Sequence, residues 1–90
     1  MDRLTKKQLI ALATRLNAKV IAKDIEQYGN ALHELISDYY TNGHQVYSEI
    51  VAYCAGFHEN TGRVDKIIDF DTNEYYFVCW YWQNKLVMLL

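Results

Sequence analysis

Residues 75–82 read Tyr-Tyr-Phe-Val-Cys-Trp-Tyr-Trp and hold six of the chain's thirteen aromatic residues. Aromatic and β-branched residues favour the pleated surface of a strand. A strand sends alternate side chains to opposite faces, and neither face of this strand would be polar. The stretch therefore predicts either a central strand covered on both faces, or a strand whose second face is covered by a partner molecule.

Two further segments with the period-2 pattern of a strand flank this stretch, at 64–70 and 85–90. The short segments 71–74 and 83–84 between them have the composition of turns. We therefore expect a three-stranded antiparallel meander with strands at about 64–70, 75–82 and 85–90.

The two faces of this meander differ in their expected role. One face, which includes Ile68, Phe77 and Cys79, is almost entirely apolar, and we assign it to the helices. The opposite face collects Tyr76, Trp80, Trp82, Val87 and Leu89, with Asp65, Asp69 and Lys85 at its border. Because Trp and Tyr are enriched at protein interfaces, this second face is the expected protein-binding surface, with Asp65 and Asp69 in its polar rim.

The residues before the strands show the 3.6-residue period of amphipathic helices. Thr5 and Gln8 form a capping box, which predicts a helix over about 5–17. Asp24 with Gln27 is a second start signal, and the periodicity predicts helices over about 24–41 and 44–55, but it leaves open whether residues 5–41 form one helix or two. The expected fold is α+β in a single domain, residues 1–90, with two or three N-terminal helices packed on one face of the C-terminal meander.

Charge is distributed unevenly along the chain, although the net charge is only −2. Residues 1–23 hold six of the nine Lys and Arg residues, whereas residues 24–90 hold ten of the eleven acidic residues. Arg15, Lys19 and Lys23 would form one basic stripe if the first helix continued that far, which makes nucleic-acid binding the alternative hypothesis. The acidic residues of the following helix would repel a phosphate backbone.

Metal, cofactor and catalytic sites are not expected from the sequence. Asp69–Asn73 resembles the start of a calcium loop, but Glu74 and Trp80 stand where that loop needs Gly and a bidentate Glu. Cys54 and His58 have the four-residue offset of zinc ligands on a helix, but Gly56 is expected to end the helix between them, and neither His33 nor His44 adds an H-x-x-x-H pair. We expect Cys54 and Cys79 to be buried free thiols. No apolar run reaches the ~18–20 residues that span a bilayer, and no signal peptide is evident, so we expect a cytoplasmic protein without a membrane partner.

These observations favour a non-enzymatic protein-binding module, an inhibitor or adaptor that acts by covering a partner's surface. In length and in its lack of catalytic motifs, the chain is similar in type to small phage proteins that block host defence enzymes, such as anti-CRISPR proteins, although no motif carries this similarity. A homodimer through the aromatic sheet face or through the C-terminal edge strand is a further expectation.

Overall fold

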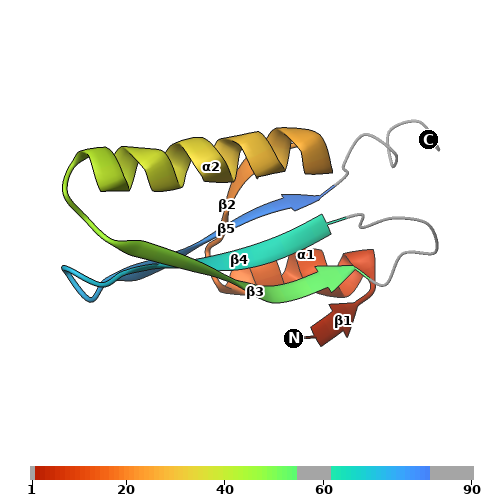
Figure 1. Ribbon diagram of the computed structural model, residues 1–90. Helices are drawn as coiled ribbons and strands as arrows, with labels where there is room; N and C mark the ends of the chain where they lie inside the picture. The colour runs from red at the N-terminus through yellow and green to blue at the C-terminus, as the bar shows by residue number, and fades with distance from the viewer. Residues whose placement is uncertain (1, 55–61, 82–90) are drawn as a thin grey trace.

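The structure, a computed structural model, describes residues 2–54 and 62–81 (Figure 1). The elements in chain order are β1 (Asp2–Leu4), α1 (Lys6–Arg15), β2 (Lys19–Ala22), α2 (Ile25–Thr41), β3 (Val46–Cys54), β4 (Gly62–Asp69) and β5 (Tyr75–Tyr81). The strands form one sheet in the order β1-β3-β4-β5-β2. The three central strands are antiparallel, and each edge strand runs parallel to its neighbour. None of the described helices is long and apolar enough to cross a membrane.

The α+β class is confirmed, but the predicted three-stranded meander is wrong, because the sheet is five-stranded and mixed. The expected third helix, 44–55, is instead strand β3, which pairs with β4 along most of its length. Apolar β-branched and aromatic residues are frequent in this segment, and they favour a strand once a partner strand lies beside it. The expected strand at 85–90 lies outside the described residues.

The two helices begin at side-chain caps that the sequence predicts. The Thr5 side chain accepts a hydrogen bond from the Gln8 N–H, and the Gln8 side chain accepts one from the Thr5 N–H. Asp24 accepts a hydrogen bond from the Gln27 N–H in the same way at the start of α2. Asn17 adopts a left-handed conformation with φ 54° directly after α1, so residues 5–41 form two helices separated by β2.

Each helix covers a different face of the sheet. On one face, Tyr28 and Leu32 of α2 pack with Ile67, Val78 and Trp80. On the other face, α1 packs against the sheet, and the buried residues of this cluster are Leu9, Ala13, Ala52, Cys54, Val64 and Cys79. Figure 1 shows the longer α2 running along the sheet, and α1 lying below only the end that is farther from the β4–β5 turn. The expectation that all helices pack on one face is therefore wrong.

Candidate interaction surface

The sheet has two halves that differ in what surrounds them. Within residues 2–54 and 62–81, β1 pairs with Ala52–Cys54 alone, and β2 pairs with residues 78–80 of β5 alone. We call β1, β2 and the residues that pair with them, together with Gly62–Val64, the closed half of the sheet, because α1 and α2 cover its two faces. The open half consists of residues 46–50, 66–69 and 75–77, where three strands continue toward the β4–β5 turn beyond the reach of α1.

The open half presents two rows of side chains on the face that α1 leaves uncovered. Strand register places Tyr47, Ile68 and Tyr75 side by side in one row. The next row consists of Glu49, Lys66 and Phe77. We define the open face as these six residues together with Phe70, which follows β4.

Three aromatic side chains of the open face are largely exposed. Tyr47 is 51% exposed, and Phe70 and Tyr75 are each 60% exposed. The rings of Tyr47 and Phe70 lie 6.3 Å apart, and those of Tyr75 and Phe77 lie 5.9 Å apart in an edge-to-face arrangement. The Lys66 ammonium lies 4.4 Å from the centre of the Tyr75 ring, a distance at which a cation is attracted to an aromatic face. The exposed rings are therefore supported by neighbours rather than projecting alone.

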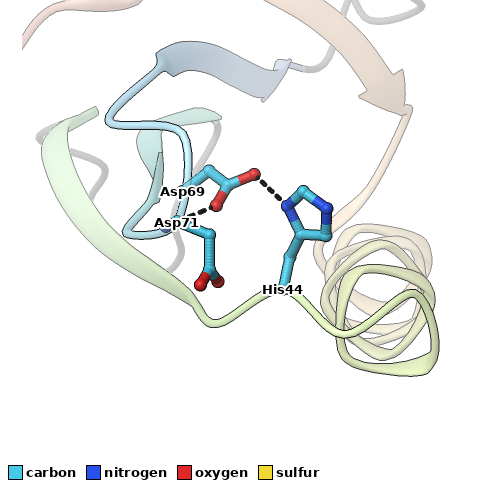
Figure 2. A group of neighbouring side chains, drawn as sticks. All are labelled: His44, Asp69 and Asp71. Atoms are coloured by element: carbon cyan, nitrogen blue, oxygen red, sulfur yellow. Dashed lines mark hydrogen bonds and ion pairs between the residues drawn. The ribbon is translucent and has the colours of Figure 1, made fainter.

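A cluster of polar groups fixes the turn that carries Phe70 (Figure 2). Asp69 Oδ2 lies 2.8 Å from His44 Nδ1, and Asp69 Oδ1 accepts a hydrogen bond from the Asp71 N–H at 2.9 Å. Asp71 in turn accepts a hydrogen bond from the Gln45 N–H at 2.6 Å. The Phe70 N–H donates to the Gln45 carbonyl at 2.9 Å. These contacts tie the β4–β5 turn to the segment that joins α2 to β3, and they hold the Phe70 backbone in one position.

The charge of Asp69 is stabilised by this cluster. Burial alone would raise the pKa of Asp69, because it disfavours the charged form. Hydrogen bonds from His44 and from the backbone N–H groups of Asp71 and Thr72 outweigh that effect, so the pKa lies below its ordinary value. Asp69 is therefore an ionised acceptor near neutral pH.

Among the described residues, the side chains of His44, Asp69 and Asp71 form a group that could hold a metal ion. Ligand atoms of His44, Asp69 and Asp71 all lie within 4.8 Å of one another. However, both Asp69 oxygens and one Asp71 oxygen already accept hydrogen bonds from the protein. These bonds account for the cluster as a structural connection between two loops.

The face on which the sequence predicted a binding surface lies under α2. Trp80 is only 2% exposed, and Tyr76 stacks on Tyr39 of α2 with ring centres 6.3 Å apart. Asp65 and Asp69 are 0% and 6% exposed, so they do not form an exposed rim. The predicted binding face is therefore wrong, because the longer helix α2 covers the Trp80 side, while α1 covers only part of the face that was assigned to the helices. The remaining predicted interface residues, Trp82, Val87 and Leu89, lie outside the described residues.

Asp65 instead belongs to a buried ionic contact beneath α2. Arg63 donates to both Asp65 oxygens, at 2.7 and 2.9 Å, and the Tyr28 hydroxyl donates to Asp65 Oδ2 at 2.6 Å. Burial raises the pKa of Tyr28, and its hydrogen bond to Asp65 raises it further, so Tyr28 remains a protonated donor. Because Asp65 is fully enclosed, this contact supports the fold and is not accessible to a substrate.

The predicted basic stripe does not form on one helix. Arg15 is the last residue of α1, whereas Lys19 begins the edge strand β2 and Lys23 follows that strand. All three residues are exposed. The turn after α1 separates Arg15 from Lys19 and Lys23, which resolves the open question of whether the first helix continues that far.

Comparison with known proteins finds no family model, no curated protein and no solved structure that matches this chain. The open face must therefore be interpreted from its own geometry and chemistry. Sequence reasoning singled out the aromatic strand that contributes to this surface, but it missed Tyr47, since a helix was expected there. Phe70 and Tyr75 could have been identified from the sequence, because they stand on either side of the predicted turn at 71–74, at the end of the hairpin.

Proposed function

We propose that this chain is a non-enzymatic protein-binding module, an inhibitor or adaptor, that docks a partner protein on the open face. The observation that carries the proposal is the group formed by Tyr47, Phe70 and Tyr75, which are 51%, 60% and 60% exposed on one surface. Aromatic side chains supply much of the energy of protein interfaces, because they bury a large area with few rotatable bonds. Their exposure has no evident benefit for folding.

The size of the surface is consistent with an energetic centre of an interface. Burying ~300 Å² of apolar area would contribute ~7 kcal/mol before the costs of association are subtracted. Hot spots of this kind are small relative to a whole interface and are surrounded by polar groups. Glu49, Lys66 and Glu74 provide such polar groups on and next to the open face.

Rigidity of the open face also favours binding. Tyr47 and Tyr75 project from β3 and β5, which flank the central strand β4, and the turn that carries Phe70 is tied by His44 and Asp69. A surface that is already ordered loses less conformational entropy when it binds. An inhibitor or adaptor that acts by covering a partner needs such a surface and no catalytic group.

Charge on the open half distinguishes this proposal from the nucleic-acid alternative. Exposed aromatic rings on a sheet can stack on bases, but binding also needs cations that neutralise phosphates. Lys66 is the cation of the open face, whereas Glu49 lies beside it, and Asp71 and Glu74 lie in the adjoining turn. This balance disfavours a phosphate backbone and is compatible with a protein partner that carries Lys or Arg at its rim.

Quantitative affinity capture from the native host tests the proposal. The bait variants are the triple variant Tyr47→Ser/Phe70→Ser/Tyr75→Ser and the matched control Ile25→Ser/Tyr40→Ser, which removes side chains that are 51% and 56% exposed elsewhere. The proposal predicts a protein that the wild type and the control retain and that the triple variant loses, with folding verified by circular dichroism. Equal retention by all three baits would contradict it. Capture of nucleic acid that depends on Arg15, Lys19 and Lys23 and decreases steeply with salt would support the alternative instead.

A further inference from the structure

The outer edge of β3 is free along the open half, as far as the described residues extend. β1 covers this edge only from Ala52 onward, and the segment that joins α2 to β3 ends at Gln45. The free edge therefore spans Val46–Val51, with the sequence Val-Tyr-Ser-Glu-Ile-Val. It contains no Pro and no Lys, the residues that commonly protect an edge strand from pairing.

Hydrogen bonding to β4 shows which backbone groups face outward. The Gln45 carbonyl accepts a bond from Phe70, so residue 45 directs its polar groups toward β4. In an antiparallel pair this direction alternates along the strand, and Tyr47 and Glu49 therefore also face β4. Val46, Ser48 and Ile50 consequently direct their N–H and C=O groups away from the sheet. The Tyr40 hydroxyl donates to the Val46 carbonyl oxygen at 3.4 Å, and the second lone pair of that oxygen remains available for a hydrogen bond from another chain.

We propose that a second copy of this chain pairs with this edge, antiparallel and centred on Ser48. In this arrangement Ser48 faces Ser48 of the other copy, Val46 faces Ile50, and Tyr47 faces Glu49. The outward groups of Val46, Ser48 and Ile50 then form about six hydrogen bonds between the two copies. The five residues that this pairing uses, 46–50, all lie within the free edge, with two of them on either side of Ser48.

The neighbouring register is disfavoured by charge and by hydrogen bonding. Centring the pair on Glu49 would place two carboxylates opposite each other, which is destabilising. It would also place Val46 opposite Ala52, which already pairs with Asp2 of β1, so fewer hydrogen bonds could form between the two copies. The Ser48-centred register avoids both problems and places the smallest side chain of the edge on the two-fold axis.

Pairing of this kind joins the two sheets into one. Because cross-strand neighbours lie on the same face, the two open faces would point to the same side. The row of Phe77, Lys66 and Glu49 in one copy would continue into the row of Tyr47, Ile68 and Tyr75 in the other. The inference does not depend on the proposed function, since it concerns the backbone edge and not the exposed rings.

Disulfide trapping in the full chain tests the register directly. Residues in a hydrogen-bonded antiparallel pair have Cα atoms ~5.5 Å apart, which a disulfide can span, whereas diagonal neighbours are ~7–8 Å apart. We therefore expect Ser48→Cys to form a covalent dimer under mild oxidation at least about tenfold faster than the matched variant Glu49→Cys. Cys54 and Cys79 are 3% and 0% exposed, so they do not compete.

Sedimentation velocity of the wild type completes the test. The inference predicts a concentration-dependent dimer that persists in Phe70→Ser/Tyr75→Ser and is lost in Ser48→Lys, in which two ammonium groups would face each other. A wild type that stays monomeric at all concentrations would overturn the inference, as would equal cross-linking of Ser48→Cys and Glu49→Cys. If the dimer forms but no partner protein is captured, the proposed function of the open face is contradicted, whereas the dimer inference stands.

Discussion

The closed and open halves of the sheet share the strands β3, β4 and β5 but differ in how many of their faces are covered. In the closed half, Leu9 of α1 is 0% exposed against Val64 and Cys79, which are also 0% exposed. Two rows of side chains farther toward the β4–β5 turn, the same face carries Tyr75 at 60% exposure. The strands and their composition change little between the two ends, whereas the ten-residue length of α1 limits what it can cover.

The difference indicates which apolar residues stabilise the fold and which are available for recognition. Apolar side chains of the closed half contribute through burial. Tyr47, Phe70 and Tyr75 of the open face instead remain largely exposed. Each substitution below is expected to affect these halves differently.

The largest effect is expected from truncation in the closed half. Leu9→Ala should lower the free energy of unfolding by about 3 kcal/mol, because it leaves a cavity under α1. Tyr75→Ala should cost at most about 1 kcal/mol, since the ring loses only its contacts with Lys66 and Phe77. Urea denaturation measures both values. Similar losses in the two variants would mean that Tyr75 is buried and that the halves do not differ.

A second prediction compares the buried contact of Asp65 with the partly exposed contact between His44 and Asp69. Asp65→Ala should lower the free energy of unfolding by ~3 kcal/mol, because Arg63 and Tyr28 then lose their buried acceptor. His44→Ala, at the partly exposed contact with Asp69, should cost less.

A double substitution serves as the control for the buried contact. Arg63→Met/Asp65→Leu removes both charges at once, and should be less destabilising than Asp65→Ala alone. Tyr28 keeps a carbonyl acceptor in this variant, at Val78. Chemical denaturation in which the double variant is less stable than Asp65→Ala would contradict this explanation, in which the cost of Asp65→Ala comes from the unpaired Arg63 charge.

The smallest effect is expected from acidification of the turn cluster. The folded-state pKa of Asp69 is lowered, so its contribution is fully present above the ordinary value of 3.8 and is lost as the pH falls through the lowered folded-state value. The wild type should therefore lose stability below about pH 4 more steeply than Asp69→Asn. Thermal unfolding at several pH values measures the two slopes. Equal slopes would show that the carboxylate is not stabilised by His44 and its backbone partners.

Local signals in the sequence were sufficient for several elements. The caps at Thr5 and Asp24 mark helix starts, and the alternation after residue 63 marks β4 and β5, because each of these patterns involves neighbouring residues. β3 was mistaken for a helix, since its apolar residues fit either period. β1 and β2 are short strands stabilised by pairing with distant residues, and such pairing leaves little trace in their own sequence.

The candidate surface was predicted less well than the fold class. The aromatic content of 75–82 correctly drew attention to β5, but the exposed face depends on which helix covers which side. That choice follows from the parallel strands β1 and β2, which place α1 and α2 on opposite faces. The contact between His44 and Asp69 joins residues 25 positions apart, so spacing alone could not reveal it.

Hydroxyl-radical footprinting of the intact protein, read by mass spectrometry, tests the central claim most directly. The claim is that the aromatic face of the open half is exposed while the opposite face is sealed by α2. We predict rapid oxidation of Phe70 and Tyr75 and strong protection of Tyr28 and Trp80, which are 1% and 2% exposed. Protection of Phe70 and Tyr75 equal to that of Tyr28 and Trp80 would contradict the account.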